Sequence, residues 1–180
     1  MTTAHKPIWI VTGPRGVGKT RFCLNLVLGA NQRGLSTNGL ICPPAYEGET
    51  KTAIHLLDLH TNQQRILARV RDHDTAAIST DHWVFDQEVL DWGNQILNQI
   101  EPCDLLIIDE LGPLEFTRGL GWQNAFAVLE QKHYGAAVVV IRPELINEAL
   151  SRWKDAMILE IPPNLEAEKE LELHQMILSF

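Results

Sequence analysis

Cysteine is scarce in this 180-residue sequence: the three that occur, Cys23, Cys42 and Cys103, lie far apart and form no C-x-x-C pair. This pattern predicts neither a disulfide framework nor a zinc site, and it fits a reducing compartment. Long apolar runs are missing as well, because no uninterrupted stretch approaches the ~18 residues that a membrane span needs. The first seven residues also lack the charged-then-apolar pattern of a secretory signal. We therefore expect a soluble, cytoplasmic protein that does not interact with membranes.

Positive charge is in deficit. The sequence has 15 Lys and Arg against 23 Asp and Glu, a net charge of −8, and no run of basic residues. The phosphate backbone of nucleic acid repels an acidic surface, so we expect no nucleic-acid partner. Linker-like segments are absent from the interior too. With 45% hydrophobic residues, the chain is expected to fold as one domain spanning residues 1–180.

One short segment near the start organises the rest of the chain. It fits the phosphate-loop pattern of glycine, four free positions, glycine, lysine, and serine or threonine. Its residues are Gly13, Pro14, Arg15, Gly16, Val17, Gly18, Lys19 and Thr20. The apolar run over residues 8–11 predicts a buried strand before the motif, and helical spacing over residues 21–28 predicts a helix after it. The motif requires this order of strand, turn and helix.

The residue types of the motif suit a polyphosphate ligand. Its three glycines lack a Cβ and can adopt positive φ, so that backbone N–H groups converge on an anion at the start of a helix. We expect residues 13–20, together with Arg21, to bind a nucleoside triphosphate. Lys19 is expected to reach the β and γ phosphates, and the Thr20 hydroxyl to ligate Mg²⁺ as cofactor.

A second anchor lies about ninety residues further on. Residues 103–108 form a continuous apolar run that Asp109 and Glu110 close, as in a strand buried on both faces whose acids emerge at its carboxyl end. In P-loop proteins this is the place of the Walker B aspartate. Asp109 would then hold the Mg²⁺ shell, and Glu110 would orient or deprotonate the attacking water. The alternative is a pair of surface acids at the end of an ordinary strand.

Between the two anchors, residues 31–34 read as a helix end with Gly34 in the left-handed cap position. Residues 39–42 predict a short strand, and residues 43–51 a loop near the ligand crevice. Residues 52–59 and 65–70 flank a polar turn and predict an antiparallel β-hairpin inserted into the core. Arg65 and Arg69 lie on the second strand, and Arg71 directly follows it. These arginines either clamp phosphate or cover a solvated face, and the lack of an acidic partner pattern favours the second interpretation.

The segment over residues 72–82 contains Asp72, His73, Asp74, Asp81 and His82. Such a mixture invites a metal-site interpretation, but its spacing is neither the i, i+4 of a helix nor that of a hairpin, so ordinary loop residues are favoured. Next, Asp86 is expected to cap a helix over residues 87–100.

The remainder predicts a turn after Glu110 that carries Glu115, a helix over residues 119–134, a buried strand over residues 136–141, a short helix over residues 144–153 and a last strand over residues 156–161. Asn164 is expected to cap the final helix.

In P-loop ATPases with an acid after the Walker B aspartate, a strand beside the P-loop strand often ends in a sensor of the γ-phosphate. By analogy Arg142 is a candidate sensor or cis-acting arginine, the alternative being a strand-end arginine that extends to solvent. Residues 162–164 are candidates to cover the nucleobase.

With both anchors in view, the chain resembles the THEP-type nucleoside triphosphatases, a family described from thermophiles with a human cancer-related member. The resemblance rests on residues 13–20, on residues 107–115 and on the hairpin with its preceding strand. Asp-Glu-Leu-Gly-x-Leu-Glu after an apolar strand is more specific than the P-loop alone. The resemblance implies a three-layer, RecA-like α/β fold with a mostly parallel sheet, and slow Mg²⁺-dependent hydrolysis of several nucleoside triphosphates. The sequence departs from the family pattern at Leu114, at residues 43–47 and in the tail from Asn164.

Two other functions compete with hydrolysis. A kinase would use the same P-loop and let Glu110 or a nearby acid activate an acceptor hydroxyl, but it needs an acceptor pocket and a lid. A nucleotide-gated switch or assembly factor would use slow hydrolysis only to reset binding to a protein partner. A signalling GTPase is disfavoured because the sequence has no Asn-Lys-x-Asp motif.

Overall fold

The computed structural model describes residues 6–71, 78–80 and 82–180. Its centre is a mixed sheet with strand order β6-β5-β4-β2-β7-β8-β1-β9, to which β3 adds by pairing with β4. The strands are β1 (Ile8–Thr12), β2 (Thr37–Ile41), β3 (Pro44–Glu47), β4 (Thr50–Asp58), β5 (Gln64–Val70), β6 (Trp83–Phe85), β7 (Cys103–Leu111), β8 (Tyr134–Ile141) and β9 (Met157–Glu160). The block β2-β7-β8-β1-β9 is parallel, whereas β3 to β6 pair antiparallel.

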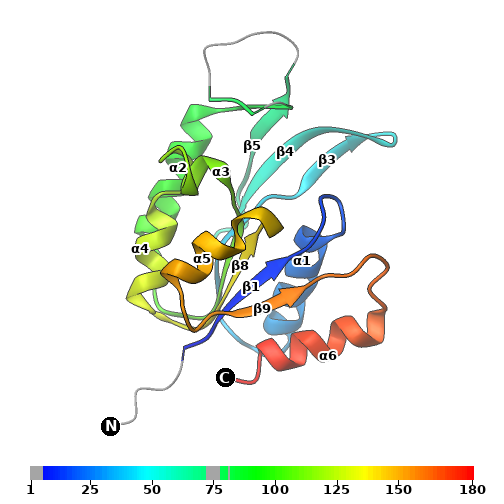
Figure 1. Cartoon of the computed structure of the whole chain (residues 1–180), viewed down its shortest axis with the longest axis vertical. Coiled ribbons are helices and arrows are strands. Elements are labelled where there is room, and N and C mark those ends of the chain that lie inside the picture. The colour runs from blue at the N-terminus through cyan, green and yellow to red at the C-terminus, as the bar shows by residue number, and fades with distance from the viewer. Residues whose placement is uncertain (1–5, 72–77, 81) are drawn as a thin grey trace.

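Helices cover both faces of this sheet (Figure 1). They are α1 (Lys19–Gln32), α2 (Gln87–Asn98), α3 (Pro113–Phe116), α4 (Asn124–Gln131), α5 (Ile146–Arg152) and α6 (Ala167–Ile177), with a 3-10 turn, η1 (Pro143–Leu145). Two hydrophobic clusters separate the layers. One packs α1 and α6 against the sheet, and the other packs α2, α4 and α5 against the opposite face. The predicted α/β P-loop fold is confirmed.

The parallel strands are apolar because both of their faces are buried. In β1, Ile8 and Ile10 belong to the cluster under α4 and α5, while Trp9 and Val11 belong to the cluster under α1. This alternation follows from the period of two along a strand. Each such side chain contributes about 1.5–3 kcal/mol on burial. The continuous apolar runs of the sequence therefore specify central strands, not half-exposed ones.

The sheet order brings three loops together at one edge. β8 lies between β1 and β7, with Ile8 opposite Ala137 and Ile108 opposite Val139. Parallel strands all point their carboxyl ends to the same edge. The segments that follow β1, β7 and β8 therefore meet there, in the crevice where open α/β sheets bind ligands.

The antiparallel part is larger than the predicted hairpin. Strands β4 and β5 confirm that hairpin, and β6 extends it. The expectation of a loop over residues 43–51 is wrong, because β3 pairs with β4 from Pro44 to Glu47. Pro44 is tolerated as the first residue of a strand that pairs on one side only, where its missing N–H breaks no ladder bond.

Two boundaries in the C-terminal half were also predicted wrongly. The helix expected over residues 119–134 is only α4, since Gly119 and Gly121 have positive φ and Lys132 ends the helix in the left-handed region. Tyr134 already belongs to β8. Asn164 does not cap the last helix: it has φ of 60°, and α6 begins at Ala167.

Both other caps are confirmed. Asp86 accepts hydrogen bonds from the N–H groups of Glu88 and Val89, and Gly34 has φ of 74° after α1.

In the part of the chain that the structure describes, no helix has the length and apolarity to cross a membrane. Asp72, His73, Asp74 and Asp81 lie outside the described residues.

Candidate active site

The phosphate-loop motif lies between the end of β1 and the start of α1, as predicted. Gly18 is the N-cap of α1 with φ of 104°, a left-handed conformation that glycine adopts without a Cβ clash. No described side chain caps the first turn of α1, so its N–H groups are open to a ligand. A helix start of this kind attracts anions, because unpaired N–H groups and the positive end of the helix dipole coincide.

The loop is packed against the chain that leaves β9. Gly13 has φ of 142°, and a Cβ at this position would lie 2.8 Å from the Ile161 carbonyl oxygen. The Ile161 N–H in turn donates to the Thr12 carbonyl at 2.8 Å. Residues 162–164, the candidate cover for a nucleobase, therefore start beside the base of the loop.

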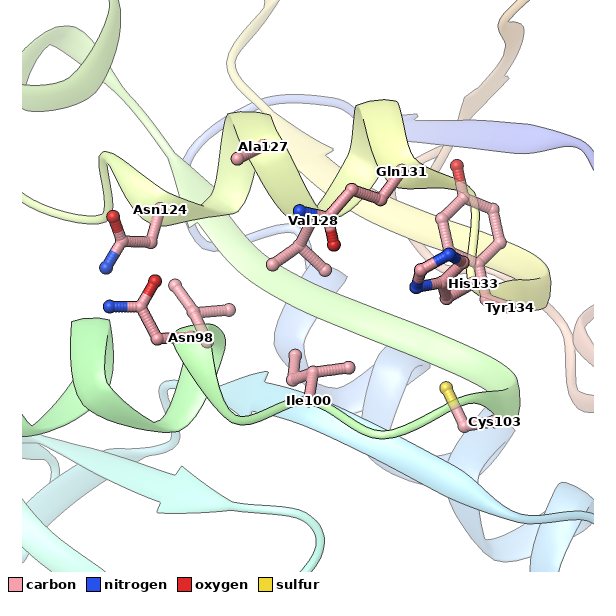
Figure 2. A pocket seen from close by; sticks show the side chains of 10 residues that line it. Asn98, Ile100, Cys103, Asn124, Ala127, Val128, Gln131, His133 and Tyr134 are labelled. Atoms are coloured by element: carbon pink, nitrogen blue, oxygen red, sulfur yellow. The ribbon is translucent and has the colours of Figure 1, made fainter.

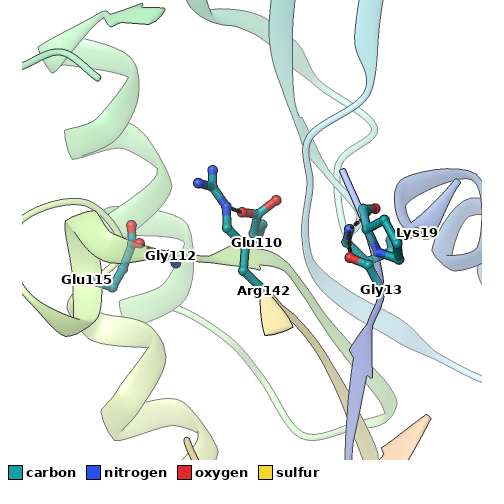
Figure 3. Close-up of polar contacts among 7 residues, drawn as sticks. Gly13, Lys19, Glu110, Gly112, Glu115 and Arg142 are labelled. Carbon is teal, nitrogen blue, oxygen red and sulfur yellow. Dashed lines mark hydrogen bonds and ion pairs between the residues drawn. The ribbon is translucent and has the colours of Figure 1, made fainter. Parts of the chain in front are cut away.

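Lys19 folds back over the loop that precedes it. Its ammonium donates hydrogen bonds to the carbonyl oxygens of Gly13, at 2.8 Å, and Pro14, at 3.0 Å (Figure 3). The residue is only 8% exposed. Burial lowers the pKa of Lys19, and the facing carboxylates of Glu110 and Asp109 oppose that shift. The loop lysine thus faces both acids at the end of β7.

Asp109 is buried beside the start of α1, 2% exposed. Its Oδ2 accepts a hydrogen bond from the Cys42 N–H at 3.2 Å. Burial raises the pKa of Asp109 to about 7, although this bond and the neighbouring Thr20 hydroxyl oppose the rise. The two residues predicted to ligate Mg²⁺ are therefore neighbours.

Glu110 forms an ion pair with Nε of Arg142, the residue that follows β8. Both side chains are 32% exposed, so the pair is accessible from the crevice. In Figure 3 this pair lies between Lys19 and the contact of Glu115 with Gly112. The candidate catalytic residues Glu110, Lys19 and Arg142 are thus together at one edge of the sheet, and Arg142 contacts the acid directly.

The remaining motif residues surround the mouth of the loop. The Val17 N–H donates to the Pro14 carbonyl at 3.3 Å and closes a turn. The guanidinium carbon of Arg21 lies 3.8 Å from the position that a Cβ on Gly18 would take. The exposed residues at the tip are Pro14, Arg15 and Gly16. The predicted phosphate-binding residues therefore form one continuous rim.

A family model described as NTPase matches residues 8–170 of this chain. The chain belongs to this family of P-loop NTPases. Nucleoside-triphosphatase THEP1 of Caldivirga maquilingensis is 32% identical over 141 residues, which cover 78% of this chain and 79% of that protein. Membership confirms the resemblance drawn from the two anchors, and it makes the chain an enzyme of the nucleoside-triphosphatase class.

Two solved structures share the fold of this NTPase. A human cancer-related nucleoside triphosphatase matches with a TM-score of 0.69 and 16% identity, covering 96% of both chains. THEP1 from Aquifex aeolicus matches with a TM-score of 0.64 and 17% identity, covering 96% of this chain and 99% of the other. At such identities the likeness concerns the fold.

Sequence reasoning left Glu115 open, as either a neighbour of the site or an exposed residue. In this NTPase it is 6% exposed, and its carboxylate accepts hydrogen bonds from the N–H groups of Gly112, at 2.8 Å, and Trp122, at 3.0 Å. Burial raises the pKa of Glu115 to about 7. Glu115 therefore fixes the chain that leaves β7 behind Glu110. The Asp-Glu-Leu-Gly-x-Leu-Glu spacing was the signal that pointed to it.

Lys51 was missed. Lys51 is the second residue of β4, next to the tip of the β3–β4 hairpin, and its side chain is half-buried. It faces the carboxylates of Glu110 and Asp109, and its other neighbours are Cys42 and Arg15. The available signal was that Lys51 is the single basic residue in the segment expected near the crevice, residues 43–51.

The hairpin arginines do not converge on the phosphate loop. Arg65 lies over the Trp92 ring of α2, 4.2 Å from its centroid, and Arg69 is exposed on β5. For Arg71, the backbone N–H donates to the His82 carbonyl at 2.9 Å. For Arg65 and Arg69, these positions fit the solvated-face interpretation better than a phosphate clamp.

A small pocket of about 60 Å³ lies between α2, α4 and the starts of β7 and β8 (Figure 2). Its lining includes Asn98, Asn124, Cys103 and Tyr134. Because Cys103 is the first residue of β7 and Asp109 is near its end, this pocket is at the edge of the sheet opposite the phosphate loop.

Within the described ranges, no three His, Cys, Asp or Glu side chains converge as a metal site.

Proposed function

We propose that this NTPase hydrolyses nucleoside triphosphates of several bases to the diphosphate and phosphate, in a reaction that depends on Mg²⁺. The observation that carries the proposal is that the buried Asp109, with Thr20 as its neighbour, and the buried Lys19 lie at a helix start that no described side chain caps. This combination brings together N–H groups that bind anions, the ammonium of Lys19, and the oxygen donors of Thr20 and Asp109.

Binding starts from groups that are already in position. Pro14 has no N–H and the Val17 N–H is bonded within the loop, so the remaining N–H groups of the loop and those of the first turn of α1 receive the phosphates. Lys19 exchanges its bonds to the Gly13 and Pro14 carbonyls for bonds to phosphate oxygens. Because these carbonyls lie in the loop itself, the lysine moves little, and a preorganised cation loses little free energy to reorganisation.

The donor set of the site fits Mg²⁺. This ion usually keeps several waters and takes one or two carboxylates plus substrate phosphates, so a full cage of protein ligands is not needed. Thr20 and Asp109 would hold it, and a buried carboxylate whose pKa is raised by burial gains from a cation nearby. When bound, Mg²⁺ supplies charge neutralisation at the β and γ phosphates.

Glu110 orients the attacking water and accepts its proton, while Arg142 holds the Glu110 carboxylate in place through their ion pair. This role is supported by the accessibility of the pair and by its charges facing Lys19, the residue expected to bind the β and γ phosphates. Arg142 also brings positive charge to that phosphate. A positioned base of this kind contributes about 10²–10⁴-fold to the rate.

Broad base preference is supported by the chain after β9. The residues that would cover a base are Pro162, Pro163 and Asn164. Proline has no N–H donor, so the two prolines offer apolar surface and few means to distinguish one base edge from another.

The test is phosphate release from ATP, GTP, CTP and UTP by the purified protein, each with and without Mg²⁺ and with no acceptor added. We expect release from all four, within about tenfold of one another, since binding is dominated by the phosphates. Release that occurs without Mg²⁺ contradicts the proposed cofactor. Nucleotide loss that requires a second substrate favours a kinase, and capture of a protein only with a non-hydrolysable triphosphate favours a switch.

A further inference from the structure

The β3–β4 hairpin, residues 44–58, begins at the acidic end of β7. β2 runs parallel to β7, so the chain that leaves β2 emerges beside Asp109. Cys42, the first residue after β2, donates its N–H to Asp109 Oδ2 at 3.2 Å. β3 then pairs with β4, with Tyr46 opposite Lys51. In Figure 1 the hairpin extends past the sheet on the same side as the loop that joins β1 to α1.

Lys51 projects from this hairpin toward the site. Its ammonium lies 4.8 Å from the centroid of the Trp83 ring, which supports it through a cation–π contact. Among the described residues, this ammonium has no hydrogen-bond acceptor and no ion-pair partner. Burial lowers the pKa of Lys51, while Glu110 and Asp109, which face it beyond ion-pair distance, oppose that shift. A half-buried ammonium without a close anion is unfavourable unless a ligand completes it.

Lys19 and Lys51 flank the same two carboxylates from different elements. Lys19 comes from the phosphate loop and has Arg142 among its neighbouring charges, whereas Lys51 comes from the hairpin and has Arg15 at the loop tip. Both lysines therefore face the carboxylates beside which a triphosphate bound along the loop would have its terminal phosphate. The terminal phosphate carries the most charge and lies nearest the acids, so it is the group that an unpaired ammonium at this place would meet.

We propose that Lys51 is a catalytic residue of the proposed hydrolysis: its ammonium binds the terminal phosphoryl group and neutralises the charge on its oxygens in the transition state. In this step a water oxygen bonds to the γ phosphorus and the bond from that phosphorus to the β–γ bridging oxygen breaks. The electron pair stays on the departing diphosphate, and the proton of the water passes to Glu110. The hairpin thus supplies in cis a cation of the kind that other NTPases place at the γ-phosphate.

The experiment compares two substitutions of Lys51 with a control on β5, the strand that pairs with β4. Lys51→Met keeps an unbranched apolar side chain but removes the charge, and Lys51→Arg keeps the charge. Arg69→Met removes one charge from exposed β5, away from the phosphate loop. For each protein, kcat and KM for Mg²⁺-ATP and the Kd of Mg²⁺-ADP are measured, and circular dichroism checks the fold.

For Lys51→Met we expect kcat to fall by about 100-fold, the low end of the about 10²–10³-fold loss that follows removal of one group that stabilises charge in the transition state. Its affinity for ADP, which lacks the terminal phosphate, should stay within about twofold. Lys51→Arg should recover most of the rate, and Arg69→Met should match the wild type.

Wild-type turnover by Lys51→Met overturns the inference, and so does a loss of ADP affinity with kcat unchanged. Failure of the proposed function has a different outcome: the wild-type protein would then release no phosphate from any nucleoside triphosphate, and the role of Lys51 would fall with it. An active wild type beside an active Lys51→Met rejects the role of Lys51 alone.

Discussion

Replacing Asp109 by asparagine should stabilise the protein in the absence of metal and nucleotide while removing its activity. Burial raises the pKa of Asp109 from the usual 3.8 to about 7. At about 1.4 kcal/mol for each pH unit, ionising this buried carboxyl at pH 8 costs about 4 kcal/mol of folding free energy. Asparagine avoids that cost. Its oxygen can accept the Cys42 N–H, and its amide can donate to the Thr20 hydroxyl, which then acts as acceptor.

The pH dependence gives this prediction its sign. Because the folded pKa exceeds the unfolded one, the folded state holds the Asp109 proton longer. The stability that this proton provides is complete below about pH 4 and is lost as the pH rises through about 7. The advantage of Asp109→Asn should therefore be near zero at pH 4 and largest at pH 8. Glu115, whose pKa burial also raises to about 7, is present in both proteins and cancels from the comparison.

The assay is urea denaturation of the wild type and Asp109→Asn from pH 4 to pH 8, at constant ionic strength with EDTA. A gain at pH 8 approaching about 4 kcal/mol, which shrinks toward acid pH, supports the reasoning. A gain that does not change with pH, or a variant that is less stable at pH 8, refutes it. In that case burial would not be what perturbs this carboxyl.

Two further substitutions test packing and the ion pair. Gly39→Ala should destabilise the fold by more than about 3 kcal/mol in urea denaturation, because Gly39 has φ of 112° and a Cβ would lie 2.0 Å from the Ile107 carbonyl oxygen. Gly29→Ala, a control in α1 with open space around it, should be neutral or stabilise by up to about 1 kcal/mol. Arg142→Met should lower kcat about tenfold or more, since Glu110 loses its partner. An unchanged kcat would show that the pair does not position the acid.

The sequence predicted the parts of the fold that depend on local chemistry. The order of glycines in residues 13–18 determines where the backbone adopts positive φ, and the apolar run before Asp109 predicts a strand covered on both faces. The caps at Gly34 and Asp86 depend on neighbouring residues only, so they could be found without tertiary information. Two anchors at the carboxyl ends of parallel strands then predicted a site at one edge of the sheet, where β8 lies between the two strands that carry them.

The parts that failed depend on long-range contacts. Pro43 and Pro44 indicate a strand end, yet β3 forms because β4 offers it an edge to pair with. The burial of Glu115 depends on Trp122, whose N–H it accepts from seven residues away along an irregular segment. Lys51 faces Glu110 only because the chain that leaves β2 emerges beside Asp109 and β3 pairs there with β4. No spacing within the segment around Lys51 encodes that approach.

The most direct test of the account is Glu110→Gln. The substitution keeps the size of the side chain and removes its capacity to accept a proton. We expect Mg²⁺-ATP to bind with an affinity within about threefold of the wild type, since Lys19 and the loop N–H groups are unchanged. Phosphate release should fall by about 100-fold or more. Binding that persists with turnover lost is the predicted result, and a Glu110→Gln protein that hydrolyses ATP at the wild-type rate would contradict the account.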